Sequence, residues 1–241
     1  MDAANIMMNG GFAMRYDVLR EYCGQSDTPI RLNTYVTFDA ERAQRDTEYR
    51  GKQFNYYSKL RGFGFKVIVR NIRWYYDDGG NRYGKANVDL DMAVDMLLQT
   101  RNLDKVYLLT GDGDFKRVVQ AIQDSGVRVE LIAFRNVSRE LTHEVDLYTS
   151  GYLIPDLLPF DGDDVNRDVM WGSPGSRVRG MCCNLQETYG FMKVMQHDYN
   201  YMNVFFHESE MRSDMELNGI YEFDLKETDR GLQGARIVFI E

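Results

Sequence analysis

Two carboxylates lie close together in one short stretch, Thr110–Phe115, which reads Thr-Gly-Asp-Gly-Asp-Phe. The apolar residues Val106–Leu109 precede it and an amphipathic run follows it, which predicts a strand, a tight turn and a helix. The two glycines let the backbone turn sharply and approach a ligand closely. We therefore expect Asp112 and Asp114 at the carboxyl end of a strand, where ligands bind in open α/β sheets.

Carboxylates held this close repel each other. At a separation of about 5 Å and an effective dielectric constant of about 20, the repulsion costs roughly 3 kcal/mol. A cation between the carboxylates removes that cost, and hard ions such as Mg²⁺ prefer a few carboxylates together with water. A second interpretation needs no metal: Asp112 caps the following helix, and Asp114 complements the positive end of its dipole.

The composition narrows the class of protein. The chain has 241 residues, a net charge of −8 and three cysteines, Cys23, Cys182 and Cys183. Two cysteines are adjacent and no CxxC pair is present, which argues against a disulfide framework and a thiolate zinc site. The sequence shows no apolar run of roughly 18 residues and no basic-then-apolar leader. We therefore expect no membrane segment and a reducing, cytoplasmic location.

Positive charge is concentrated in one part of the chain, although the total is acidic. A negative total by itself argues against nucleic-acid binding. Basic residues crowd positions 42–85, whereas Asp161, Asp163 and Asp164 form an acidic cluster in a linker-like stretch. A basic surface beside an acidic metal site suits a polyanionic substrate. An ordinary solvated helix surface is the alternative interpretation.

Alternating strand and helix signals organise the first part of the chain. Strands are expected at 31–38, 65–70, 106–109 and 128–134, and helices at 14–22, 40–60, 88–100 and 137–148. A strong turn signal lies at Asp77–Asn81. This βαβα order predicts an α/β fold, with a parallel sheet flanked by helices.

The pattern changes after residue 158. Residues 159–178 contain a proline, the acidic cluster and a Gly-Ser-Pro-Gly-Ser run, which predicts a flexible linker. Residues 179–241 contain short aromatic strands separated by turns, which predicts a small all-β barrel at the C-terminus. Such a segment is long enough to fold by itself.

The first region, residues 1–158, resembles the NYN domain, a branch of the PIN-like metal-dependent nucleases. The resemblance rests on three motifs in order: Asp2 and Asn5; Lys85, Asp89 and Asp95; and the Thr110–Phe115 strand end. It implies that RNA phosphodiester bonds are hydrolysed with Mg²⁺ or Mn²⁺ held by Asp2, Asp89, Asp112 and Asp114.

The same resemblance implies supporting roles for other residues. Asn5 and Asp95 would assist the catalytic carboxylates, and Lys85 would steady the substrate phosphate, with a plain surface lysine as the alternative. Homodimerisation is left open by analogy with PIN-like folds.

The second region, residues 179–241, resembles a cold-shock domain, an OB-type barrel of five strands. The resemblance rests on the aromatic-glycine-aromatic run Tyr189–Met192 and on Asn203–Glu210, which matches the family's Asp-Val-Phe-Val-His motif. It implies that single-stranded RNA is bound by rings on which bases stack, at about 1–3 kcal/mol per base. These rings are Tyr189, Phe191, Phe205 and His207. Phe206 is instead expected in the core.

The sequence therefore predicts a metal-dependent endoribonuclease with a second domain that binds single-stranded RNA. The main alternative is a non-catalytic RNA-binding or regulatory protein with a vestigial acidic pocket. A protein-interaction module and a different phosphate chemistry, such as phosphatase or DNA nuclease activity, are further alternatives.

Overall fold

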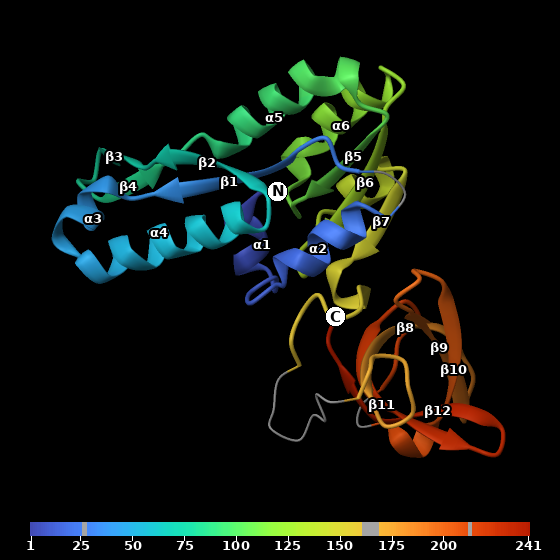
Figure 1. The fold of residues 1–241 in the computed structure, drawn as a ribbon. Coiled ribbons are helices and arrows are strands. Elements are labelled where there is room, and N and C mark those ends of the chain that lie inside the picture. The colour runs from blue at the N-terminus through green and yellow to red at the C-terminus, as the bar shows by residue number, and fades with distance from the viewer. Residues whose placement is uncertain (26–27, 161–168, 212–213) are drawn as a thin grey trace. The chain divides into compact units, whose positions relative to one another are not determined.

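The computed structural model describes residues 1–25, 28–160, 169–211 and 214–241. The chain divides into two compact units. The N-terminal unit comprises Met1–Phe12 and Tyr16–Thr149, and the barrel unit comprises Ala13–Arg15 and Ser150–Glu241. Figure 1 shows an α/β arrangement in the first unit and a closed β-barrel, in orange and red, in the second, which confirms the predicted fold class.

Parallel strands form the centre of the N-terminal unit. β1 (Leu32–Phe38) pairs with β2 (Phe65–Asn71), and β5 (Lys105–Leu109) pairs with β6 (Arg128–Ala133), beside which lies β7 (Leu147–Ser150). Both pairs are parallel, as the alternation of strands and helices in the sequence predicts.

Met1 and Asp2 lie between these two groups of strands. The amide of Tyr35 donates to the Met1 carbonyl at 3.0 Å, and the amide of Asp2 donates to the Leu109 carbonyl at 2.9 Å. Asp2 thereby forms a parallel bridge with Tyr35 and joins β1 to β5. Toward the amino-terminal ends of β1 and β5, a cavity of about 430 Å³ separates the two strands, and apolar side chains contribute much of its lining.

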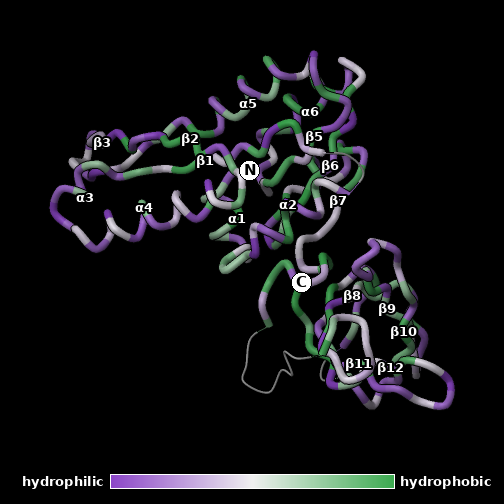
Figure 2. The backbone as a smooth tube through the Cα atoms, viewed as in Figure 1, coloured by the Kyte–Doolittle hydropathy of each residue, from purple (hydrophilic) through white to green (hydrophobic). Residues whose placement is uncertain are grey.

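Helices cover both faces of this sheet. Figure 1 shows α5 (Val88–Gln99) and α6 (Lys116–Gln123) on one face, and α1 (Ala3–Met8), α2 (Tyr16–Cys23) and α4 (Thr47–Gly62) on the other. The core beneath α5 and α6 includes Met92, Val119 and Ile122. Figure 2 shows the apolar stretches gathered around β5 and β6, whereas α3 (Ala40–Arg45) is polar. Among the described residues, no helix has the length and apolar character needed to cross a membrane.

Two predicted helices differ from the structure. The single helix expected over 40–60 is wrong: α3 ends at Arg45, and the carboxylate of the next residue, Asp46, accepts from the Tyr49 amide at 2.8 Å and caps α4. An aspartate that bonds the backbone in this way competes with helix continuation. The helix expected over 137–148 is shorter, because α7 (Arg139–Glu144) is followed by Asp146, which bonds Val129 through both its amide and its carboxylate and leads the chain into β7.

The predicted turn at Asp77–Asn81 connects an antiparallel hairpin of β3 (Arg73–Tyr76) and β4 (Arg82–Lys85). The Asp77 carboxylate accepts from the Asn81 amide at 2.8 Å and closes the turn. Lys85 is the last residue of β4, and α5 begins three residues later. The hairpin therefore leads directly into the helix that carries Asp89.

The barrel unit closes five strands in the order β10-β12-β11-β8-β9. They are β8 (Arg177–Leu185), β9 (Tyr189–Met195), β10 (Tyr201–His207), β11 (Ile220–Thr228) and β12 (Gly231–Phe239). β8, β9 and β10 form a meander, and β12 pairs with β10 in parallel to close the barrel. The result is a closed five-stranded barrel resembling an OB fold.

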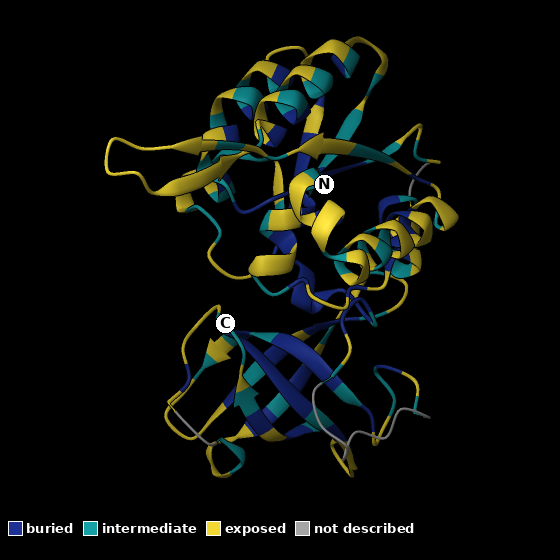
Figure 3. Cartoon of the chain, turned by 90° about the vertical axis from the view of Figure 1, so that its left-hand side faces the viewer, coloured by how far each residue is buried: buried dark blue, intermediate teal, exposed yellow. Residues whose placement is uncertain are grey.

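Alternation decides which side chains fill the barrel. Val204 and Phe206 are fully buried, as predicted for Phe206, and Figure 3 shows buried residues along the strands of this unit. Gly190 lies against the Phe206 ring, where a Cβ would overlap the ring and lie 2.5 Å from the Asn184 carbonyl oxygen. Glycine at this position lets β9 pack closely over a large core ring.

Part of the expected linker over 159–178 belongs to the barrel unit. Trp171 is buried, its ring stacks on Phe160 at 5.7 Å between centroids, and its Nε1 donates to the Met195 carbonyl at 2.8 Å. β8 begins at Arg177, two residues before the expected start of the barrel. The acidic residues Asp161, Asp163 and Asp164 lie outside the described residues.

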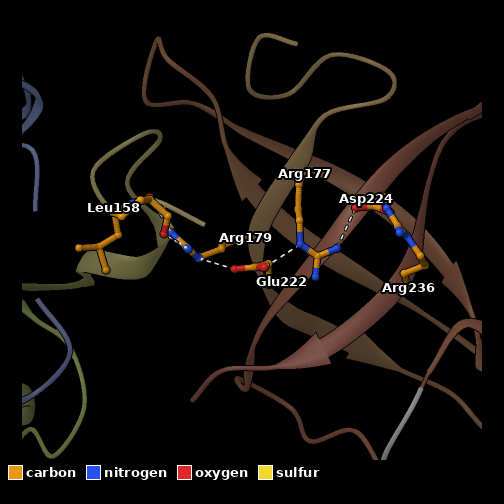
Figure 4. Close-up of polar contacts among 7 residues, drawn as sticks. Leu158, Arg177, Arg179, Glu222, Asp224 and Arg236 are labelled. Carbon is orange, nitrogen blue, oxygen red and sulfur yellow. Dashed lines mark hydrogen bonds and ion pairs between the residues drawn. The ribbon is translucent and has the colours of Figure 1, made fainter. Parts of the chain in front are cut away.

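A ladder of charged side chains crosses β8, β11 and β12 (Figure 4). Glu222 accepts from Arg177 Nε at 2.6 Å and from Arg179 Nε at 3.0 Å. Asp224 accepts from Arg177 at 2.8 Å and pairs with Arg236. Arg179 also donates to the Leu158 and Pro159 carbonyls. The buried charges are thus paired, and the segment before the barrel is tied to its first strand.

Substituting Gly190 with alanine tests the packing of β9 on Phe206. We expect Gly190→Ala to destabilise the barrel unit by about 1–3 kcal/mol, because the methyl group enters a filled core. Gly51→Ala is the matched control: Gly51 lies inside α4 with nothing within 4 Å of its added methyl group, and alanine favours the helix. Thermal unfolding followed by circular dichroism measures both; equal melting temperatures for Gly190→Ala and the unchanged protein would contradict the packing.

Candidate functional site

Asp2 is held at the start of α1 by its own backbone contacts. Its carboxylate accepts from the Asn5 amide at 3.1 Å and caps the helix. Asp2 is only 6% exposed. Burial raises the pKa of the Asp2 carboxyl, the amides of Asn5 and Ala4 lower it, and the nearby charge of Asp112 raises it. The Asp-x-x-Asn spacing therefore places one carboxylate at the centre of the sheet.

Asn5 fastens the turn that follows β5. Its Oδ1 accepts from the Gly111 amide at 2.8 Å, across a sequence separation of 106 residues. The Gly111 carbonyl in turn accepts from the Ser138 amide at 2.9 Å. An added Cβ on Gly111 would lie 3.3 Å from Val137 Cα, and one on Gly113 would lie 2.7 Å from Ser138 Oγ. Both glycines therefore lie in close contact with the segment that leads into α7, and a side chain at Gly113 would displace Ser138.

Asp112 and Asp114 lie in the same turn. Asp112 caps a short 3₁₀ turn (Gly113–Phe115), and its carboxylate accepts from the Asp114 amide at 3.0 Å. The Asp112 amide donates to Thr110 Oγ1 at 3.2 Å. The capping interpretation of Asp112 is therefore confirmed for this turn. It does not exclude a ligand, because a capping carboxylate keeps further lone pairs.

Asp89 brings a fourth carboxylate from the first turn of α5. Burial is the largest cause that raises the pKa of the Asp89 carboxyl, followed by the charges of Asp2, Asp112 and Asp114. Carboxylates from the N-cap of α1 and from the turn after β5 thus repel that of Asp89 in α5. We call Asp2, Asp89, Asp112 and Asp114 the carboxylate group.

The donor set of the carboxylate group suits a hard divalent cation. Carboxylate oxygens are the ligands that Mg²⁺ prefers, and an ion would relieve the repulsion that raises the pKa of Asp89. As the side chains lie in the described residues, no group of three or more Asp, Glu, His or Cys is gathered closely enough to hold an ion. The residue types and the charges that act on Asp89 nonetheless fit such an ion.

Asp95 and Lys85 have surroundings of their own. The hydroxyl of Tyr35 donates to Asp95 at 2.8 Å, which holds α5 against β1 and raises the pKa of Tyr35 beyond its burial effect. Asp91, one turn earlier, pairs with Arg70 of β2. Lys85 lies opposite Arg73 in the hairpin and is exposed. The role of Tyr35 was not evident from the sequence, because it depends on the packing of α5 against β1 in the folded chain.

The four predicted ring residues of the barrel share one face of β9 and β10. Phe205 pairs with Phe191 and His207 pairs with Tyr189 across the two strands. The ring centroids of Tyr189 and Phe205 are 5.9 Å apart and nearly parallel, and those of Phe191 and Phe205 are 5.8 Å apart. Tyr189 is 41% exposed. The residues predicted to stack on bases are therefore contiguous and accessible.

The matches to known proteins cover the two units separately. The model of the NYN domain family matches residues 1–154. The protein LabA of Synechococcus elongatus, named for low amplitude and bright, is 28% identical over 92 residues, which cover 37% of this chain and 50% of LabA. The chain thus spans about half the length of that curated relative.

Two solved structures are also similar to parts of the chain. A protein of unknown function from Vibrio parahaemolyticus, VPA0982, is 21% identical with a TM-score of 0.49, over 62% of this chain and 88% of that one. The Drosophila Unr CSD456 structure is 24% identical with a TM-score of 0.24, over 28% of each chain.

The pH dependence of stability tests the repulsion at Asp89. A carboxyl whose pKa is raised on folding binds its proton more tightly in the folded state, so its penalty is present at neutral pH and disappears as the pH falls below the ordinary value. We expect Asp89→Asn to raise the free energy of unfolding of the metal-free protein at pH 7 by less than about 1 kcal/mol, because the group is partly solvated, and so to raise its melting temperature.

The difference in melting temperature between Asp89→Asn and the unchanged protein should become smaller as the pH falls toward 4. Melting curves in EDTA between about pH 4 and 8 measure it. Asp124→Asn, at the exposed end of α6, removes a carboxylate outside the group and is the control. Identical pH profiles for Asp89→Asn and Asp124→Asn would contradict the coupling.

Proposed function

The chain belongs to the NYN domain family over residues 1–154, and from that membership we propose that it is a metal-dependent endoribonuclease. The proposed reaction is hydrolysis of RNA phosphodiester bonds with Mg²⁺ or Mn²⁺. The observation that carries the proposal is that Asp2, Asp112 and Asp114 come near enough to Asp89 for their charges to add to the effect of burial in raising the pKa of Asp89. Such repulsion is unfavourable unless a cation occupies the space between the groups.

Each residue of the proposed site has a task that follows from its contacts. Asp89 and Asp112 supply carboxylate oxygens to the ion and Asp2 supplies a third, less exposed one. Asn5 holds the Gly111 amide, so that the turn carrying Asp112 keeps its position. When bound, the ion polarises the phosphoryl oxygen, lowers the pKa of a water molecule and stabilises the leaving oxygen. Lys85 contributes positive charge toward the substrate phosphate.

In this proposal, the barrel unit provides the binding surface for single-stranded RNA. Tyr189, Phe191 and Phe205 present a continuous ring surface, and His207 lies at its end opposite Tyr189. Bases stack on such surfaces with little sequence preference, because every base has a π face. In the proposed enzyme the barrel therefore binds the strand and the N-terminal unit cuts it.

One observation favours a second candidate function. In the described part of the chain, the carboxylates are not gathered closely enough to hold an ion as they stand. A non-catalytic RNA-binding protein with a vestigial acidic pocket would show the same arrangement. The two functions differ in one measurable property, which is metal-dependent cleavage of bound RNA.

Cleavage of a labelled single-stranded RNA by the full chain in Mn²⁺ tests the carboxylate group. We expect Asp112→Asn to lower the cleavage rate by about 100-fold or more, because the amide removes a charge that the ion requires. Its side-chain oxygen can still cap the 3₁₀ turn, so the fold is retained. Asp124→Asn should cleave at the unchanged rate.

The same assay decides between the two functions. Cleavage by Asp112→Asn at the unchanged rate would refute the assigned site. RNA binding by a folded protein without cleavage in either metal ion would instead support the non-catalytic function.

Removing a ring from the barrel face tests its role in RNA binding. We expect Phe205→Leu to weaken binding of a single-stranded oligoribonucleotide by about 1 kcal/mol, or roughly fivefold, since leucine fills similar space without a π face. Phe239→Leu is the matched control, because Phe239 is an exposed ring on β12, away from the β9–β10 face. Fluorescence anisotropy measures both. Equal affinities for the two variants would favour a protein-docking role for the face.

A further inference from the structure

We propose that the β3–β4 hairpin carries a subsite for single-stranded RNA beside the carboxylate group, a proposal that rests on the nuclease function above. In this subsite Arg73 and Lys85 hold a backbone phosphate, and the neighbouring base packs on the rings of Tyr75 and Tyr83. The four side chains come from two adjacent cross-strand pairs of one hairpin.

The pairing register places these four side chains on one face. Arg73 is directly opposite Lys85, and Tyr75 is directly opposite Tyr83. Because successive residues of a strand point to opposite faces, the two pairs lie on the same face, one beside the other. The tyrosine rings stack with centroids 5.7 Å apart and an interplanar angle of 26°, and both are about half exposed.

The charged pair of this face is unfavourable by itself. Like charges directly opposite each other destabilise an antiparallel pair. Neither Arg73 nor Lys85 forms an ion pair with any residue that the structure describes. By contrast, Arg70 in the preceding strand pairs with Asp91. An anion between Arg73 and Lys85 would convert the repulsion into two favourable contacts.

The opposite face of the hairpin is fastened to α3 and its cap. Trp74 Nε1 donates to the Asp39 carboxylate at 3.3 Å, and Arg82 pairs with Glu41. The Arg82 guanidinium also lies 4.2 Å from the centre of the Trp74 ring. At Gly84 a Cβ would lie 2.7 Å from Ile72 and crowd the Trp74 ring. The hairpin is therefore anchored on one face and presents cations and rings on the other.

These side chains border a groove of about 700 Å³ that is mostly polar. Its lining includes all four residues, together with Asn71 and Asn87, whose amides can donate to or accept from a nucleotide. Asn87 immediately precedes α5, whose first turn carries Asp89. Along the chain, the groove residue Lys85 therefore precedes Asp89 of the carboxylate group by only four positions.

The chemistry of the groove selects its ligand. The two cationic side chains that form no ion pair suit a phosphate, and the tyrosine rings suit a base. Each nucleotide of a single-stranded nucleic acid carries one phosphate and one base. The two rings already cover each other, so a base stacks on an outer ring face and does not insert between them.

Neighbouring tyrosines on opposite faces provide the sharpest test. The full chain is titrated in EDTA with a fluorescein-labelled decauridylate, and affinity is read by anisotropy. We expect Tyr75→Ala to weaken binding about tenfold. Tyr76→Ala, which removes an exposed ring from the opposite face, should leave the affinity unchanged. Circular dichroism confirms that both variants are folded.

Salt dependence tests the charged pair. For single strands, the slope of log affinity against log salt becomes shallower by about 0.7 for each phosphate that the protein no longer neutralises. We expect that change for Arg73→Gln and none for Arg101→Gln, which removes a charge beyond the other end of α5. Decauridylate containing 4-thiouridine should also crosslink to Tyr75 or Tyr83 under ultraviolet light.

The outcomes separate this subsite from the nuclease function. Unchanged affinity and salt slope in both Tyr75→Ala and Arg73→Gln would overturn the subsite, even if the protein cleaves RNA. Loss of affinity in those variants would support the subsite even if no metal ion gave cleavage, in which case the nuclease function alone would fail. Equal losses in Tyr75→Ala and Tyr76→Ala would also overturn it, since no particular face would then be responsible.

Discussion

The repulsion among four carboxylates is the constraint on which the N-terminal unit depends. Asp2, Asp89 and the pair in the turn after β5 come from three separate segments. The charges of Asp2, Asp112 and Asp114 add to the effect of burial in raising the pKa of Asp89, and that of Asp112 also raises the pKa of Asp2. The fold keeps them near each other through hydrogen bonds to backbone amides, chiefly the bond from the Gly111 amide to Asn5 and the capping of α1 by Asp2. Close approach of the backbone at Gly111 and Gly113 completes this arrangement.

Backbone hydrogen bonds hold Asp2 in place despite this repulsion. Asp2 is bonded on both sides, to Tyr35 of β1 and Leu109 of β5, so it cannot retreat from its neighbours without breaking the centre of the sheet. Tyr35 also holds α5 through Asp95. In the function proposed above, a cation bound among these carboxylates would remove that repulsion. The same logic applies on a smaller scale to Arg73 and Lys85 in the hairpin.

In the barrel unit, β9 and β10 together carry aromatic side chains on both faces. Phe206 faces inward and is fully buried, while its neighbours Phe205 and His207 face outward with Phe191 and Tyr189. The paired charges of Arg177, Glu222 and Asp224 link β8 to β11, away from the strands that carry the rings. β10 thus contributes Val204 and Phe206 to the core on one face and, together with β9, carries the rings on the other.

Local patterns in the linear order were enough to predict most elements and most candidate residues. Periodicity identified the strands and the turn at residues 110–115, and alternation predicted that Phe206 is buried. These features could be predicted because helix and strand periods are properties of neighbouring residues. The meeting of distant segments is visible only in the folded chain: Asp46 divides one predicted helix into two, Tyr35 holds Asp95, and Trp171 belongs to the barrel core.

The face formed by Arg73, Tyr75, Tyr83 and Lys85 likewise requires the strand register that follows from the hairpin turn. Such contacts depend on pairing across the fold, and the residues involved carry no sign of their partners in the linear order.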